Sequence, residues 1–275
     1  MNNDRLLYRR GILQLVASGF FLSTAGIALR LVEQADGWQI LFYRSLALSV
    51  TILLILVFQK RSRFFDEFRG LGWNDCLLAV FLGTGFVAYV FALLYNTVAN
   101  ALFIFSCAPF VAGFLGWILL GERVATRTWF AIGVAMAGLA VMVGSELAVS
   151  RYLGTLLALW IPIAYAASII AVRRSKRDNM LVALCLAGLV AGGLSAFFVT
   201  DYALTPRDLI ISLYLGVFQV GVGFTLVVLG SRYVPAAQVG LLALVEPVLA
   251  PIWAWMGVGE VPGLATIVGG TIIFL

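Results

Sequence analysis

Ten apolar runs, separated by short polar or charged turns, constrain the fold of this chain more than any other feature of its sequence. The hydrocarbon core of a bilayer is about 30 Å thick, so a helix needs about 20 apolar residues to cross it. We therefore predict an all-α membrane protein with ten transmembrane helices. They cover residues 11–29, 39–58, 76–95, 99–120, 126–145, 153–172, 180–200, 208–230, 236–256 and 263–275. The last run gives only about 20 Å of helix, and we expect that the tenth helix is cut short.

The composition argues against soluble and catalytic alternatives. Hydrophobic residues make up 63% of the 275 residues and charged residues 11%, against about 25% charged residues in a soluble domain. There is no His, which removes His-ligated zinc and haem sites and the Ser-His-Asp triad. Cys76, Cys107 and Cys185 lie inside apolar runs, too widely spaced for a redox pair or a metal site. We predict that the chain is not an enzyme and binds no metal and no cofactor.

The positive charges are distributed unevenly between the two sides of the predicted helices. Fourteen of the 18 Lys and Arg residues lie on the side of the N-terminus, and only Arg30, Arg151 and Arg207 lie on the other. Cytoplasmic loops of membrane proteins are enriched in Lys and Arg, so both termini are predicted to be cytoplasmic. The basic residues are spread over short loops and form no patch, so nucleic acid is not an expected partner.

The sequence repeats itself at an offset of 138 residues. Residues 83–122 and 221–260 share eleven identities in forty positions without a gap. The aligned pairs include Gly83 with Gly221, Gly85 with Gly223, Phe86 with Phe224, Tyr95 with Tyr233, Pro109 with Pro247, Trp117 with Trp255, and Gly121-Glu122 with Gly259-Glu260. With one shift of register, residues 11–30 also align with 154–173.

The repeat divides the chain into two halves, residues 1–145 and 146–275, with five predicted helices each. An odd number of helices forces the second half to enter the membrane upside down relative to the first. Inverted repeats are typical of alternating-access transporters, whose substrate site lies near the midplane between the halves. We therefore expect a central cavity between two inverted five-helix repeats.

The pattern of Pro109 with Gly121-Glu122-Arg123, and of Pro247 with Gly259-Glu260-Val261, resembles the drug/metabolite transporter superfamily of the EamA type. Within it, the sequence is most similar to aromatic amino acid exporters of the YddG type. The resemblance implies that helices 1–4 and 6–9 surround the cavity, with helices 5 and 10 outside. It also implies export of amino acids and related metabolites across a bacterial inner membrane.

Polar side chains inside the predicted helices are candidates for the cavity. Arg44 and Glu246 stand out, because either charge would cost at least about 2.5 kcal/mol facing lipid. Arg44 could attract a substrate carboxylate, or it could reach the membrane interface or bond backbone carbonyls. Glu246 could bind an ammonium group, carry a proton or act as a structural carboxyl. The full candidate set is Gln14, Ser18, Arg44, Tyr89, Asn100, Trp160, Tyr165, Gln219, Gln238 and Glu246.

Three of these candidates, Tyr89, Trp160 and Tyr165, are aromatic residues away from the helix ends, where they could stack on a substrate or simply pack. Glycines and prolines inside the helices could act as hinges for rocking half-helices, or could only shape the cavity. These hinge candidates are Gly83, Gly85, Pro109, Pro162, Gly221, Gly223, Pro247 and Pro251.

The sequence therefore predicts a monomeric inner-membrane exporter of neutral or aromatic amino acids, with a small-molecule substrate and the lipid bilayer as its partners. One Arg and one Glu in the cavity suit a zwitterion better than a polyphosphate, which needs several cations. Proton exchange and facilitated diffusion both stay open. The alternatives are efflux of drugs or hydrophobic cations and, from other classes, an intramembrane lipid-modifying enzyme or a structural membrane protein.

Overall fold

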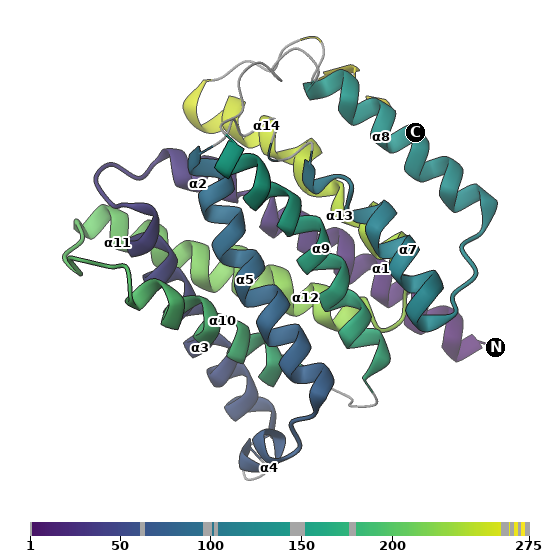
Figure 1. Cartoon of the computed structure of the whole chain (residues 1–275), viewed down its shortest axis with the longest axis horizontal. Coiled ribbons are helices and arrows are strands. Elements are labelled where there is room, and N and C mark those ends of the chain that lie inside the picture. Colours follow the sequence, from purple (N-terminus) through teal and green to yellow (C-terminus); the bar gives the residue numbers. More distant parts are fainter. Residues whose placement is uncertain are drawn as a thin grey trace.

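The computed structural model describes residues 2–60, 64–95, 101, 104–143, 152–175, 180–259, 264, 267–268 and 271–272, and these form a bundle of helices without a strand (Figure 1). Within these described residues, six segments are long and apolar enough to cross a membrane, and two shorter apolar helices accompany them. The helices are α1 (Asn2–Leu22), α2 (Ala25–Arg30), α3 (Gly37–Lys60), α4 (Phe64–Arg69), α5 (Trp73–Tyr95), α7 (Ala108–Leu120), α8 (Thr126–Val143), α9 (Tyr152–Arg174), α10 (Leu181–Ala196), α11 (Pro206–Tyr214), η2 (Leu215–Val222), α12 (Gly223–Gly230), α13 (Ala236–Ala243) and α14 (Val245–Val258).

These helices overlap the first nine predicted runs, and several runs are interrupted. The first run is split between α1 and α2, and the eighth consists of α11, η2 and α12 in direct succession. The ninth is divided between α13 and α14. The run 263–275 lies mostly outside the described residues, so the count of ten stays a prediction.

Helix packing joins the two halves of the chain. Helix α5 packs against α9 and α10, and α10 packs against α3. Helix α1 packs against α12, and α7 against α13 and α9. Figure 1 shows α8 at the edge of the bundle, apart from the central helices. Along the repeat, α5 corresponds to η2 and α12, and α1 corresponds to α9. The contact of α5 with α9 therefore has its counterpart in the contact of α12 with α1.

Two backbone features recur at positions 138 residues apart. Among the described glycines, Gly121 and Gly259 alone have positive φ angles, 66° and 71°. Such left-handed residues end helices because they let the final carbonyls find donors, and glycine adopts this conformation without strain. In addition, a turn at Ser106 and Cys107 precedes α7, and the break between α13 and α14 lies at Leu244, 138 residues after Ser106.

One segment distinguishes the halves. Residues Leu215–Val222 form a π-helix, whereas α5, which aligns with this region along the repeat, is α-helical from Trp73 to Tyr95. The π-helix lies directly against α3, because a Cβ atom on Gly216 would collide with the backbone carbonyl of Arg44. Only glycine permits this approach.

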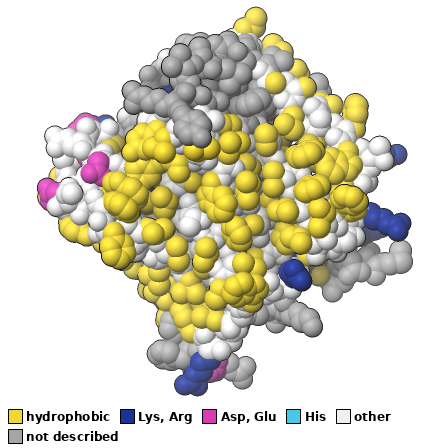
Figure 2. Space-filling view, viewed as in Figure 1, with side chains coloured by type: hydrophobic (Ala, Val, Ile, Leu, Met, Phe, Trp, Pro, Cys, Tyr) yellow, Lys and Arg dark blue, Asp and Glu magenta, His cyan; other side chains and the backbone are white. Residues whose placement is uncertain are grey.

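The surface agrees with a membrane location. Figure 2 shows a broad band of hydrophobic side chains, with Lys and Arg at its lower and right edges and Asp and Glu mainly at its left edge. Exposed apolar residues come from several helices, including Leu54 of α3, Phe130 of α8 and Leu189 of α10. We call the end of the bundle with the start of α1 and the end of α9 the basic end.

Candidate functional site

A cavity lies between the halves, where α1, α3, α5, α9, η2, α12, α13 and α14 meet. Its polar lining consists of Arg44, Tyr89, Tyr165, Gln219 and Glu246, all of which the sequence had singled out. Its apolar lining consists of Leu22, Leu82, Gly85, Phe86, Phe105, Ile161, Ala164, Phe224 and Ala243.

Two ionisable side chains, one basic and one acidic, are buried in this cavity. Arg44 is 4% exposed and Glu246 is 5% exposed. The Tyr89 hydroxyl donates a hydrogen bond to Oε1 of Glu246 at 2.9 Å. The guanidinium carbon of Arg44 lies 5.6 Å from the ring centre of Phe86 and 6.0 Å from that of Tyr89. Both rings offer a cation–π contact to the guanidinium, and the ion pairs among the described residues do not include Arg44.

Aromatic rings form a continuous wall around the charges. Phe86 and Phe224 meet edge to face with their centres 5.0 Å apart, and Tyr165 lies 6.3 Å from Phe224. Phe105 contacts Tyr165 on the other side, at 5.6 Å. Edge-to-face packing at these distances is favourable for aromatic pairs. The wall offers flat apolar faces beside a cation and a carboxyl group.

The apolar lining follows the internal repeat, whereas the polar lining does not. Phe86 and Phe224 occupy aligned positions, and so do Phe105 and Ala243. By contrast, the polar residues align with apolar ones: Tyr89 with Val227, Gln219 with Phe81, and Glu246 with Ala108. The wall phenylalanines were missed by the sequence reasoning because they resemble core residues, although the aligned pair Phe86 and Phe224 was a signal for them.

The cavity is small. Its volume is about 40 Å³, measured as the space that the centre of a water-sized sphere can reach. A site needs roughly 10 to 15 Å³ on this measure to hold one water molecule, so about three would fit. An amino acid needs more space than this, so we describe this conformation as contracted.

Four further candidates lie away from the cavity. The Trp160 side chain is 36% exposed, and its indole N–H donates to Thr84 at 3.0 Å, so it is directed outward. The Ser18 hydroxyl donates to the Leu15 carbonyl at 2.6 Å within α1. Gln238 accepts a hydrogen bond of 2.7 Å from Tyr8 at the basic end.

Gln14 is the fourth, at the contact between α1 and α12, where a Cβ atom on Gly230 would lie 3.3 Å from its Cβ. The rotation of each helix about its own axis decides which of these side chains face inward. A run of apolar residues does not determine that rotation. Asn100 lies outside the described residues.

The hinge candidates include residues at close helix contacts and prolines inside helices. Gly85 lines the cavity, and a Cβ atom on Gly83 would lie 2.8 Å from the Ala187 carbonyl of α10. The backbone of Pro109 lies against Gly240 of α13. The others lie in α9 (Pro162), η2 (Gly221), α12 (Gly223) and α14 (Pro247 and Pro251).

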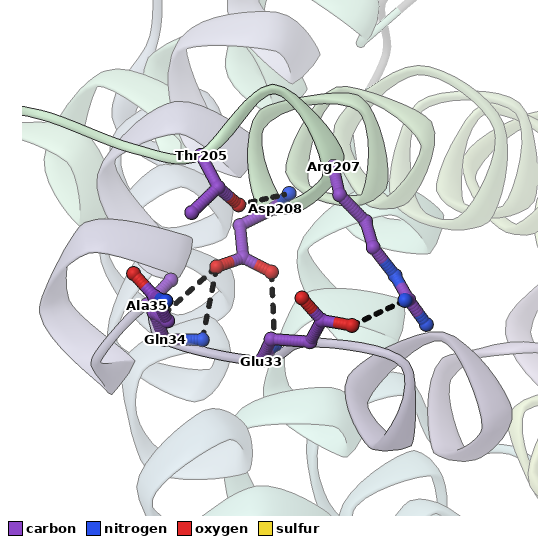
Figure 3. Close-up of polar contacts among 6 residues, drawn as sticks. All are labelled: Glu33, Gln34, Ala35, Thr205, Arg207 and Asp208. Atoms are coloured by element: carbon purple, nitrogen blue, oxygen red, sulfur yellow. Dashed lines mark hydrogen bonds and ion pairs between the residues drawn. The ribbon is translucent and has the colours of Figure 1, made fainter.

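A cluster of hydrogen bonds ties the halves together at the end opposite the basic end. The buried Asp208 carboxylate accepts bonds from the backbone N–H groups of Glu33, Gln34 and Ala35 at 2.9, 3.0 and 3.1 Å (Figure 3). The hydroxyl of Thr205 caps α11 by accepting from the Asp208 N–H, and Arg207 forms an exposed ion pair with Glu33. We call the six residues of Figure 3 the Asp208 clamp.

A second cluster ties the halves together at the basic end. The carboxylate of Glu122, just after α7, pairs with Arg173 of α9 and accepts a bond of 3.0 Å from the Ala236 N–H. Arg173 also donates to the carbonyls of Ser231 and Val234. We call these five residues the Glu122 clamp. The cavity is therefore enclosed between two polar clamps.

Fold and site together define a polytopic membrane protein with a buried amphipathic cavity that is clamped at both ends. Among the described residues, no group of three His, Cys, Asp or Glu side chains could hold a metal ion. This arrangement is that of a membrane transporter for small molecules.

The chain belongs to the EamA-like transporter family of the drug/metabolite transporter superfamily, because the sequence profile of that family matches residues 9–144 and 152–275. An uncharacterised transporter of Archaeoglobus fulgidus is 28% identical over 198 residues, which cover 71% of this chain and 72% of that protein. The uncharacterised transporter YwfM of Bacillus subtilis is 28% identical over 159 residues, 56% of this chain and 54% of that protein. A solved crystal structure covers 100% of this chain and 94% of its own with a TM-score of 0.77 at 17% identity, which establishes a shared fold.

Proposed function

We propose that the chain transports neutral and aromatic amino acids, and related zwitterions, out of the cytoplasm. The observation that carries this proposal is the cavity itself, in which an Arg44 guanidinium that forms no ion pair with a described residue and a buried carboxyl group stand beside aromatic faces. The guanidinium suits a substrate carboxylate, which it can bind through two parallel hydrogen bonds. The rings of Phe86, Phe224 and Tyr165 suit a flat or aliphatic side chain.

The second part of the proposal is alternating access between two inverted five-helix repeats, residues 1–145 and 146–275. It is supported by the two separate family matches, by the glycine caps at Gly121 and Gly259, and by the paired apolar lining of the cavity. Two similar packings, each open at one end, can then have nearly equal free energies. The Lys and Arg content of the short loops supports a cytoplasmic basic end, and thus cytoplasmic termini in a bacterial inner membrane.

The first experiment is counterflow in proteoliposomes. Vesicles loaded with one unlabelled amino acid at a time are mixed with labelled phenylalanine, threonine or methionine, and label uptake is followed. We expect exchange above that of protein-free vesicles, ranked by substrate. Absence of exchange for every amino acid, with protein shown to be folded, would overturn the proposal.

Arg44→Leu tests the role of the carboxylate. The expected result is a loss of affinity for phenylalanine of about 10- to 100-fold, because one charge-assisted interaction disappears. Phenethylamine, which lacks the carboxylate, should compete equally well against both proteins. Arg127→Leu, at an exposed position of α8, is the matched control and should leave both affinities unchanged.

Efflux of hydrophobic cations is the second candidate function, because Glu246 lies within an aromatic wall that would also suit an amine. In that case amines without a carboxylate would exchange and amino acids would not.

Glu246→Gln separates substrate recognition from proton transport. If Glu246 carries a proton, the variant loses the pH dependence of transport while substrate binding persists. An unaltered pH profile in well-folded protein would exclude the proton role.

A further inference from the structure

The side chain of Gln219 carries a buried hydrogen-bond acceptor that has no donor among the described residues. It is 2% exposed, and its amide oxygen Oε1 has no partner and is closed to water. Its amide nitrogen donates to the Leu22 carbonyl at 3.3 Å, where α1 ends. Buried polar atoms are almost always paired, so an acceptor without a donor needs an explanation. Within the described part of the chain, only Gln14 shares this property.

The residue that carries this unpaired acceptor lines the cavity. The residue lies in the π-helix η2 and lines the cavity together with Arg44. π-helical turns are rare and occur frequently at functional sites. The same π-helix touches the backbone of Arg44 through Gly216, so the helix segment that carries Gln219 packs directly against the helix that carries Arg44.

We propose that Oε1 of Gln219 accepts a hydrogen bond from the ammonium group of the substrate and thereby selects amino acids over analogues that lack it. The inference rests on the proposed function and assigns to Gln219 the recognition of one substrate group. Glu246 is engaged by Tyr89, whereas the Gln219 acceptor is unoccupied. A neutral amide also adds no charge to the cavity when a zwitterion enters.

The contracted state gives this acceptor its selectivity. In that state Oε1 is out of reach of water, and a substrate that parts the helices brings the missing donor with it. A ligand without an ammonium group opens the cavity but leaves the acceptor unpaired. Sites built to hydrogen-bond a polar group discriminate strongly against analogues without that group, for this reason.

The test is competition against counterflow of labelled phenylalanine, by unlabelled phenylalanine and by 3-phenylpropionate, which has the same ring and carboxylate without the ammonium. For the wild type we expect 3-phenylpropionate to compete at least about 100-fold more weakly. In Gln219→Leu this ratio should fall about tenfold or more, because the acceptor is gone. Gln14→Leu is the matched control: it removes the other unpartnered amide oxygen, which does not line the cavity, and should keep the wild-type ratio.

A wild-type ratio in Gln219→Leu would overturn the role of Gln219 while leaving amino acid transport intact. If the Leu variant does not fold, Gln219→Met gives the same test with an unbranched side chain, and Gln219→Glu, which keeps an acceptor, should retain the preference for phenylalanine. A wild-type protein that exchanges no amino acid would overturn the proposed function, and this inference with it.

Discussion

Among the described residues, the end of the bundle opposite the basic end is held closed by many separate bonds, whereas the bonds at the basic end come mainly from one carboxylate and one guanidinium, with one further bond from Tyr8 to Gln238. In the Asp208 clamp, a buried carboxylate is satisfied by three backbone N–H groups. Nearby, Gln39 donates to the carbonyls of Asp201 and Ala203, and Tyr43 donates to that of Tyr202. In the Glu122 clamp, the side chains of Glu122 and Arg173 make all the bonds named for the cluster.

This difference indicates which end opens more easily. Bonds shared among several loops must break together, whereas one ion pair with 19% of each side-chain surface accessible can be broken by the movement of a single helix end. Exposed ion pairs contribute little stability and partly buried ones somewhat more, but fully buried carboxylates with several backbone donors are the costliest to disrupt. The contracted conformation should therefore open first at the basic end.

The largest effect is expected for Asp208→Ala. The variant leaves three backbone N–H groups without their acceptor and should lower the free energy of unfolding by about 3 kcal/mol. Thermal unfolding in detergent, followed by tryptophan fluorescence, measures this. Asp201→Ala removes an exposed carboxylate that accepts one backbone bond, from Ala203, and is the matched control with an expected change of about 1 kcal/mol or less. Equal melting of Asp208→Ala and the wild type would refute the special role of this clamp.

A smaller effect on stability is expected for Glu122→Ala, about 1 to 2 kcal/mol. The double variant with Arg173→Ala should lose less than the sum of the two single losses, because both side chains belong to one network. Additive losses would contradict the network.

Glu122→Ala should also make the cavity more accessible from the basic end and leave its access from the other end unchanged. In a cysteine-free background carrying Ala243→Cys, Glu122→Ala is expected to raise the labelling rate of the cavity cysteine severalfold from the basic end, with no change from the other end. A water-impermeant maleimide applied to either side of oriented vesicles provides the measurement. Equal acceleration from both sides would mean that the clamp stabilises the bundle without gating it.

The smallest effect is expected for Arg207→Ala. Its ion pair with Glu33 is about half exposed, with 52% and 53% of the side-chain surfaces accessible. Its loss should cost about 0.5 kcal/mol or less, a shift of about 1 to 2 °C in melting temperature. A large shift would show that the exposed pair contributes as much to closure as the buried carboxylate.

The all-helical fold and most helix positions could be predicted from the sequence, because runs of about 20 apolar residues have few stable structures other than a membrane-spanning helix. The polar lining was partly predictable for a similar reason: Arg44 and Glu246 cannot face lipid cheaply, so they lie inside. Trp160 can face either lipid or the cavity without such a cost, so the sequence could not decide its direction, and the structure places it outward.

The remaining features depend on contacts between distant segments. Asp208 bonds to residues more than 170 positions earlier in the chain, and no local pattern indicates that pairing. The π-helix around Gln219 likewise follows from its approach to α3 through Gly216, because hydrophobic periodicity does not distinguish one wide turn.

The contracted cavity has a consequence for any measured affinity. If only a fraction of the molecules is open at a given moment, the apparent dissociation constant of a substrate exceeds its intrinsic value by the inverse of that fraction. A substitution that loosens the Glu122 clamp then strengthens apparent binding without touching the substrate. Weak binding to the wild type and tighter binding to such a variant would together report the occupancy of the open state.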